Sequence, residues 1–276
     1  MNPHQAFPAN IVELFRSQWR NRQLIAQMTK REVVGRYRGS VLGLAWSFFN
    51  PILMLSVYTF VFSVVFKARW GAGGGEDKAS FAVFLFVGMI VYGIFAECVN
   101  RAPGLIVSNA NYVKKVVFPL EILPSVAMGS ALFHASISLV VLLSAQLLFH
   151  QRLPWTIVFL PVILLPLLLA TAGVAWVLSS LGVFVRDIAQ ITGVLTTVLM
   201  FLSPVFYPLS ALPKKFQLWL HLNPLTFIIE EARNVLIFGN TPDWTGLVFV
   251  LAASLAIATG GFWWFQKTRK GFADVL

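Results

Sequence analysis

Six stretches of mostly apolar residues limit what this chain can fold into, because each is long enough to cross a lipid bilayer. A helix that spans the hydrocarbon core needs about 20 apolar residues. Charged residues make up only 12% of the chain, against about 25% in soluble domains. Backbone amides inside lipid need partners within the protein, which favours helices. The pattern predicts an all-α integral membrane protein with six transmembrane helices, at residues 41–66, 81–99, 122–149, 155–181, 188–208 and 247–265.

The basic residues predict which side of the membrane holds the chain termini. Loops rich in Lys and Arg are normally cytoplasmic, and six spans place both termini on one side. The segment before the first span holds seven basic residues, and the tail after the last span holds three more. Both termini of this multi-pass protein are therefore predicted to be cytoplasmic. The same rule accounts for the net charge of +10 without a nucleic-acid partner.

Residues 1–38 are predicted to form a cytoplasmic amphipathic segment on the membrane surface. Basic helices of this kind bind anionic headgroups with one apolar face. A solvated basic arm is the alternative. Residues 39–276 are predicted to form a single transmembrane domain. The apolar residues that recur at helical spacing in the first segment are Ile11, Leu14, Phe15, Trp19, Leu24, Ile25 and Met28.

Two amphipathic runs between the fifth and sixth predicted spans are too short to cross a membrane. They cover residues 216–222 and 225–238 and are separated by Asn223 and Pro224. Two short re-entrant or interfacial helices on the outer side fit this pattern. Re-entrant backbone survives at membrane depth only where protein or a water-filled cavity surrounds it. The pair is therefore expected to border a pore, with an outer loop on the headgroups as the alternative.

The sequence lacks the motifs of nucleotide and metal chemistry. It contains no G-x-x-x-x-G-K-[ST] phosphate-binding loop and no H-E-x-x-H or similar metal-ligand spacing. The chain is therefore not expected to be an enzyme or to hold a cofactor or a metal. Its single cysteine, Cys98, excludes an intrachain disulfide.

Two polar residues stand out within the predicted spans. Glu97 lies near the inner end of the second span, where it is expected to reach water or a basic partner, because an isolated charge in lipid is costly. His134 lies within the third span and is expected to be a hydrogen-bonded core residue, with a mechanistic role as the alternative. Intramembrane charges are otherwise almost absent, so the energy for any transport is expected to come from outside this chain.

Aromatic residues within the spans suit a pore that carries sugars. Aromatic faces stack on sugar rings, and a phenol hydroxyl adds a hydrogen-bonding group. We expect such a pore to be lined by Tyr58, Tyr92, Phe95 and Phe206. Packing within the protein or against lipid is the alternative role for each of these residues.

Five motifs resemble the membrane subunit of a type-2 ABC exporter. In particular they resemble the Wzm-like permeases that export O-antigen, capsule or teichoic acid. They keep their order over almost the whole chain. The motifs are R-Y-R-G-S-V-L-G at 36–43 with Trp46 and Asn50-Pro51, V-V-F-P-L-E-I-L-P at 116–124, R-D-I at 186–188, S-P-V-F-Y at 203–207 and N-P-L at 223–225.

The resemblance implies a complex of four chains in a bacterial inner membrane. Two permeases would form a homodimer around a pore and pair with two separate ATPase subunits, which would bind ATP and Mg²⁺. The loop around residues 108–118 would hold a coupling helix that docks on the ATPase. Its polar residues are Asn109, Asn111, Lys114 and Lys115. A plain solvated loop is the alternative.

The resemblance also implies a lipid-linked glycan as the substrate, usually carried on undecaprenyl diphosphate. Arginine forms strong charge-assisted hydrogen bonds with phosphate groups. Arg36 and Arg38, at the inner mouth of the first span, are the candidates for a diphosphate entrance. Their alternative role is to set topology and to contact anionic lipid.

Three other functions remain open at this stage. One is a type-2 ABC permease for a small drug or a lipid. A second is a membrane-embedded transferase of lipid-linked sugars, which would be expected to cluster acidic, Lys or His residues at a membrane face. A third is a channel that works without ATP.

Overall fold

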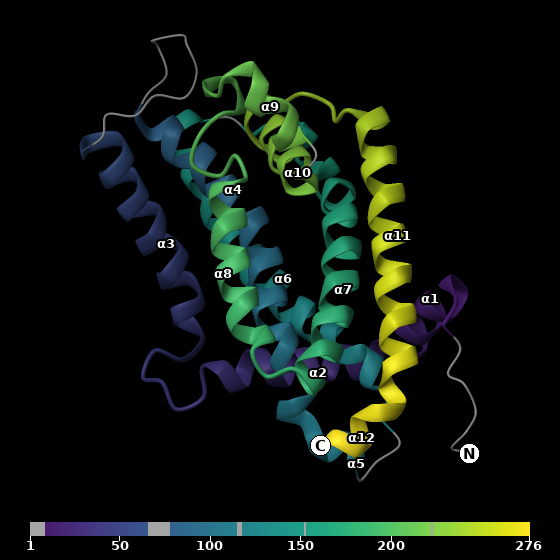
Figure 1. Cartoon of the computed structure of the whole chain (residues 1–276). Coiled ribbons are helices and arrows are strands. Elements are labelled where there is room, and N and C mark those ends of the chain that lie inside the picture. Colours follow the sequence, from purple (N-terminus) through teal and green to yellow (C-terminus); the bar gives the residue numbers. More distant parts are fainter. Residues whose placement is uncertain (1–8, 66–77, 115–117, 152, 222) are drawn as a thin grey trace.

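Every secondary-structure element of the computed structural model is a helix (Figure 1). The structure describes residues 9–65, 78–114, 118–151, 153–221 and 223–276. The prediction of an all-helical fold is confirmed for these residues. Six helices run along the bundle: α3 (Trp46–Tyr58), α4 (Lys78–Arg101), α6 (Leu123–His150), α7 (Leu160–Phe184), α8 (Ile188–Phe201) and α11 (Trp244–Thr268).

Shorter helices cover the two ends of the bundle. At the lower end of Figure 1 lie α1 (Ile11–Arg20), α2 (Arg22–Arg36), α5 (Ala110–Lys114) and α12 (Phe272–Val275), and at the upper end lie α9 (Lys214–His221) and α10 (Pro224–Arg233). Two π-helical segments are η2 (Thr59–Val65) and η8 (Asn234–Phe238). The 3₁₀ turns are η1 (Gly43–Ala45), η3 (Ala102–Gly104), η4 (Val107–Asn109), η5 (Leu120–Ile122), η6 (Trp155–Phe159), η7 (Leu209–Ala211) and η9 (Arg269–Gly271).

Five helical stretches in the described part of the chain are long and apolar enough to cross a membrane. They coincide with five of the six predicted spans. The sixth, predicted at 188–208, contains the apolar helix α8, which is 14 residues long and about 21 Å in length. The total of six membrane spans therefore remains a prediction. The five stretches are Gly43–Val61, Phe81–Gly104, Leu120–Leu148, Trp155–Phe184 and Trp244–Val275.

Helices α7 and α11 pack so closely that their backbones touch. A Cβ atom added to Gly261 on α11 would lie 2.7 Å from the Cα atom of Gly173 on α7. A Cβ atom added to Gly173 would lie 2.8 Å from the Cα atom of Ala258. Small residues permit this close approach between membrane helices, where van der Waals contact holds helices together.

We expect Gly261→Leu to prevent this packing and to sharply reduce the amount of folded protein. The new side chain meets backbone atoms, which cannot rotate away as a side chain would, and overpacking a core costs about 1–3 kcal/mol or more. Gly260→Leu is the matched control, because a Cβ atom there meets nothing within 4 Å. The measurement is the yield of monodisperse protein in detergent and its thermal midpoint. Equal behaviour of the two variants would contradict the close contact.

Residues 11–36 form two helices, α1 and α2, that lie across the lower end of the bundle (Figure 1). Asn10 starts α1, because its side-chain oxygen accepts a hydrogen bond from the backbone amide of Glu13 at 2.8 Å. One face of each helix is buried, through Leu14 in α1 and Met28 in α2. The other face carries basic residues, as expected of an amphipathic segment. Its position on a membrane surface stays a prediction.

The two short helices predicted between the fifth and sixth spans are present as α9 and α10. Helix α10 packs on α4 and α7, and a fully buried arginine, Arg233, fixes it there. The Arg233 guanidinium donates to the carbonyl oxygens of Phe84 at 3.1 Å and Val205 at 3.0 Å, and it pairs with Glu230 at 2.8 Å. Burial lowers the pKa of Arg233 to about 10. This arginine ties α10 to α4 and to the segment after α8.

Candidate functional site

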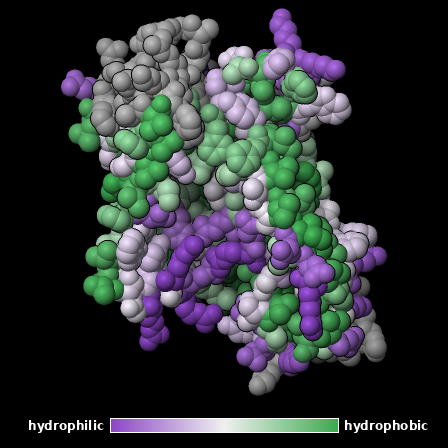
Figure 2. Space-filling view, turned by 60° about the vertical axis from the view of Figure 1, so that its left-hand side comes forward, coloured by the Kyte–Doolittle hydropathy of each residue, from purple (hydrophilic) through white to green (hydrophobic). Residues whose placement is uncertain are grey.

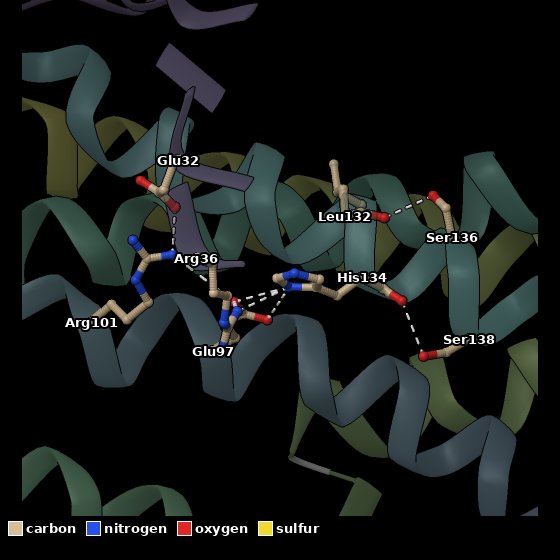
Figure 3. Close-up of polar contacts among 8 residues, drawn as sticks. All are labelled: Glu32, Arg36, Glu97, Arg101, Leu132, His134, Ser136 and Ser138. Atoms are coloured by element: carbon tan, nitrogen blue, oxygen red, sulfur yellow. Dashed lines mark hydrogen bonds and ion pairs between the residues drawn. The ribbon is translucent and has the colours of Figure 1, made fainter. Parts of the chain in front are cut away.

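Three helices bring charged and polar side chains together at one point (Figure 3). Arg36 is the last residue of α2, Glu97 lies on α4, and His134 lies on α6. The Nη1 atom of Arg36 donates to Oε1 of Glu97 at 2.6 Å and lies 3.1 Å from Nδ1 of His134. We call these three residues the polar cluster. Glu97 thus has the basic partner that the sequence suggested.

The Nδ1 atom of a neutral His134 can form a hydrogen bond with either Arg36 or Glu97, but not with both. That atom lies 3.2 Å from both carboxylate oxygens of Glu97 as well as 3.1 Å from Arg36. A neutral imidazole nitrogen either donates or accepts a hydrogen bond. When Nδ1 carries the proton it donates to Glu97, and Nε2 is then an acceptor. Nε2 is buried and has no hydrogen-bond partner among the described residues.

A second ion pair extends the polar cluster along α2 and α4. Arg101 pairs with Glu32 at 2.6 Å and lies 3.9 Å from Glu97. The two carboxylates and the two guanidinium groups therefore alternate in space, so their formal charges cancel. Half of the Arg36 side chain, 52%, is exposed, against 21% for Glu97. The pair is therefore open to solvent on the Arg36 side and partly buried on the Glu97 side.

Tyr37 lies next to the polar cluster, just after the end of α2. Its ring meets the His134 ring edge to face at 6.1 Å. Burial raises the pKa of the Tyr37 hydroxyl above its usual value, and the Glu97 charge raises it further, while Arg36 opposes the shift. The hydroxyl therefore stays protonated at neutral pH and is available as a hydrogen-bond donor.

A cavity of about 170 Å³ opens beside the polar cluster, between α3, α4 and α6. Glu97 and His134 line one part of it, and Tyr58 and Asn50 of α3 line another. Aromatic, amide and charged groups thus face the same space. Figure 2 shows hydrophilic residues gathered in a band across the lower half of one face, where the surface is hollowed between two apolar columns.

The two arginines of the predicted diphosphate entrance have different surroundings in the structure. Arg36 belongs to the polar cluster. Arg38 lies in the turn that follows α2, where its backbone amide donates to the Gly35 carbonyl oxygen at 3.3 Å and its side chain is exposed. Gly39 follows with a φ of +86°, a conformation that suits glycine. Both arginines are accessible, and their substrate role stays a prediction.

The four aromatic residues predicted to line a pore occupy different surroundings. Tyr58 lines the cavity beside the polar cluster. Tyr92 is buried, and its hydroxyl donates to the backbone carbonyl oxygen of Thr196 on α8. Phe95 lies beside Tyr92, with a ring distance of 6.2 Å, and Phe206 stacks on Phe201 at 5.7 Å. Tyr58 is the one of the four that shares a cavity with the polar cluster.

The residues predicted to dock an ATPase lie in and beside the short helix α5. The Asn109 side chain donates to the Leu105 carbonyl oxygen at 2.8 Å, which shapes the turn before α5. Asn111 is exposed. Lys114 donates to the carbonyl oxygen of the C-terminal residue, Leu276. Lys115 lies outside the described residues.

Helix α5 also contacts α2, which the sequence did not suggest. The Tyr112 hydroxyl accepts a hydrogen bond from Nη2 of Arg31 at 3.1 Å, and the Tyr112 ring stacks on Phe118 at 4.4 Å. Arg31 lies five residues before Arg36 on the same helix. Helix α2 therefore touches the predicted docking segment near its middle and the polar cluster at its end.

A buried ion pair holds the chain ends against this region, and it too was missed from the sequence. Glu121 is 4% exposed, and its Oε2 atom accepts from Nη1 of Arg269 at 2.6 Å. Its Oε1 atom accepts from the Ser17 hydroxyl at 2.9 Å. Arg269 also donates to the Phe118 carbonyl oxygen at 2.7 Å. The pair thus joins α1, the segment before α6 and the end of α11.

The spacing of acidic and basic residues in the sequence could have predicted part of the polar cluster. Glu32 and Arg36 are four residues apart, as are Glu97 and Arg101. Residues four apart lie on one face of a helix, so each helix presents an acid and a base on one side. Two such faces in apolar surroundings are expected to pair. No comparable spacing in the sequence pointed to His134.

Comparison with known proteins places this arrangement in a family. The model of the family described as ABC-2 type transporter matches residues 23–237. The chain is 29% identical over 268 residues to the O-antigen export system permease protein RfbA of Myxococcus xanthus, covering 96% of this chain and 100% of that protein. It is 26% identical over 255 residues to the protein of the same name from Klebsiella pneumoniae, covering 92% and 95%.

A capsule-related protein matches as well. The chain is 22% identical over 237 residues to the polysialic acid transport protein KpsM of Escherichia coli, covering 82% of this chain and 85% of that protein. The family match includes α4, α6, all of α2 except its first residue, and all residues of the polar cluster. The chain belongs to the ABC-2 type transporter family.

Proposed function

We propose that the chain is the permease subunit of an ATP-driven exporter that moves a lipid-linked, O-antigen-like polysaccharide across the inner membrane. The observation that carries this proposal is the match, over nearly the full length of both chains, to permeases named for O-antigen export. The relatives named for polysialic acid and capsule transport also handle long glycans. Long polysaccharide is therefore favoured over a small drug or a lipid as the substrate.

Separate ATPase subunits would supply the energy. The sequence has no phosphate-binding loop of its own. Helix α5 offers an exposed surface with Asn111 and Lys114, and its contact with Arg31 connects it to α2. Docking at α5 would thus reach Arg36 and the polar cluster through one rigid helix.

The exporter would have six spans per subunit, with both termini in the cytoplasm. Helix α8 supports the sixth span, because it is apolar and packs beside α4 and α7. Helices α1 and α12 lie at the same end of the bundle, which agrees with an even number of spans. A second copy of the chain would cover exposed apolar side chains of η2 and α8, such as Phe60 and Val194, and close the pore.

The diphosphate of the substrate would meet Arg36 and Arg38 at the cytoplasmic mouth. Arg36 is held at its place by Glu97 yet is half exposed. A diphosphate carries more charge than a carboxylate and accepts more hydrogen bonds, so it competes well for a guanidinium group. The first sugars would then reach the cavity that Tyr58 lines, and α9 and α10 would cap the outer exit.

Deleting the gene in its host tests this function. We expect the long surface polysaccharide to disappear while its lipid-linked precursor accumulates in the cytoplasm, because synthesis continues without export. A plasmid copy is expected to restore the surface polysaccharide, as measured by gel profiles and surface staining. An affinity-tagged copy is expected to retain an ATPase during purification. Normal surface glycan in the deletion strain, or purification without any ATPase, would contradict the proposal.

A further inference from the structure

A second cavity lies along α2, over residues that precede Arg36 of the polar cluster. It is a groove of about 580 Å³ between α2 and α6, within the range of about 300–1,000 Å³ that is typical of small-molecule sites. Most of its walls are apolar, with Ile25, Val33 and Val34 on α2, Phe133 on α6, and Leu44 at one edge. Val34 and Leu44 are each close to half exposed, so the groove is open to its surroundings.

One close contact holds the two helices on either side of this groove together. A Cβ atom added to Gly129 of α6 would lie 2.6 Å from the Thr29 hydroxyl of α2. The same hydroxyl donates to the Val126 carbonyl oxygen at 3.4 Å. Larger apolar side chains line the groove beside this contact. The glycine thus brings α2 onto α6 at one level and leaves an apolar hollow beside it.

Two cations line the same groove. Arg22 and Lys30 belong to one stripe of α2 with Ala26 and Val34, at intervals of four residues. They are about 12 Å apart along the helix. Neither forms an ion pair in the described part of the chain. Arg22 lies over the Trp19 ring at 4.7 Å and donates to the Trp19 carbonyl oxygen.

Three other charged residues of α2 differ in this respect. Arg31 donates to Tyr112, Glu32 pairs with Arg101, and Arg36 pairs with Glu97. The charges that face α4 and α5 are therefore matched by the protein itself. The charges along the groove lack a carboxylate partner, although they border an apolar hollow. An amphiphile with an anionic head and an apolar chain has the chemistry that matches this arrangement.

We propose that this groove binds one anionic phospholipid from the leaflet on the N-terminal side. An acyl chain would lie on the apolar wall between Val33 and Phe133, and the phosphate would bind Lys30, with Arg22 adding positive charge about 12 Å away along the helix. Basic pockets beside membrane helices recognise anionic headgroups in this way, and burial of the acyl chain adds affinity. Zwitterionic lipids offer the same chain but no net negative charge. The lipid would hold α2 in place along the part of the helix that the ion pairs do not reach.

Lipid titration of the purified full chain tests this site. The protein is stripped of lipid in detergent and titrated with phosphatidylglycerol or phosphatidylcholine, and bound lipids are counted by native mass spectrometry. We expect one saturable site that prefers phosphatidylglycerol. Arg22→Gln with Lys30→Gln is expected to weaken that site by about tenfold or more. Arg22→Lys with Lys30→Arg keeps both charges and is expected to retain it.

A steric variant tests the groove itself. Ala26→Trp fills the groove and is expected to remove the saturable site while the protein remains monodisperse. Gln27→Trp is the matched control, because Gln27 is an exposed neighbour outside the groove. Equal lipid binding by all variants, or no preference for phosphatidylglycerol, would overturn the proposal. So would binding of undecaprenyl phosphate that phosphatidylglycerol fails to displace, which would assign the groove to the carrier of the substrate.

Discussion

Replacing both Arg36 and Arg38 with alanine is expected to abolish polysaccharide export while the permease still accumulates in the membrane. Each loss removes a cation at the predicted diphosphate entrance, and arginine–phosphate hydrogen bonds are among the strong ones. Folding should change little, because the Arg36–Glu97 pair is partly exposed and such pairs contribute up to about 1 kcal/mol. Surface polysaccharide and the amount of membrane-bound permease are measured in the same cells.

Two comparisons separate substrate binding from the other roles of these arginines. Glu97→Gln removes the charge of the partner but keeps Arg36. If Arg36 binds the diphosphate, the Glu97→Gln variant is expected to export polysaccharide. If the ion pair itself is required, this variant is expected to lose export as the arginine double variant does. Arg16→Ala with Arg20→Ala removes two exposed cations from α1 and controls for topology and lipid contact. Normal export by the Arg36 and Arg38 double variant would disprove the entrance.

Glu121→Ala is expected to cause a large loss of stability. Glu121 is buried and accepts hydrogen bonds from Arg269 and Ser17. Removing one partner of a buried pair costs about 3–5 kcal/mol, which corresponds to a fall in the thermal midpoint of about 10 °C in a chain of this size. The midpoint is measured in detergent by intrinsic fluorescence.

The matched variants for this prediction separate charge from packing. Glu121→Gln keeps the shape of the side chain and one acceptor oxygen, and it is expected to lower the thermal midpoint less than Glu121→Ala does. Glu121→Ala with Arg269→Ala removes both charges. Its loss of stability is expected to be smaller than the sum of the losses from the two single changes, because the effects of contacting residues are not additive. Hydrogen exchange should increase in α1, which Ser17 ties to Glu121. An unchanged midpoint for Glu121→Ala would show that the pair adds no stability.

Most of the helices could be predicted from the sequence because apolar runs in lipid allow one regular structure. The runs at 81–99 and 247–265 appear within α4 and α11, and those at 122–149 and 155–181 appear as α6 and α7 with the 3₁₀ turns η5 and η6 before them. The two short outer runs appear as α9 and as α10 with η8. The first run is less regular: η1 precedes α3, and the π-helix η2 follows it. Hydropathy alone does not distinguish these helix types.

The candidate site was only partly predictable. Arg36 was chosen from its position at the mouth of the first span, and Glu97 was noted as a rare intramembrane charge. Their pairing joins residues 61 positions apart, and the contact of Arg36 with His134 joins residues 98 positions apart. A periodic pattern reports neighbours within one helix, whereas these contacts depend on how α2 crosses α4 and α6.

The sequence by itself determined that this chain is helical, that it has apolar stretches long enough to cross a membrane, and that it contains no phosphate-binding loop motif. It also determined the family, through motifs spread along the chain. The tertiary structure alone decided which charges meet. Helix α2 lies across the bundle, and this crossing pairs Arg36 at the end of the helix with Glu97 and leaves Arg22 and Lys30 along an apolar groove earlier in the helix. The physical reason is that local pattern fixes the faces of a helix, while packing fixes what each face meets.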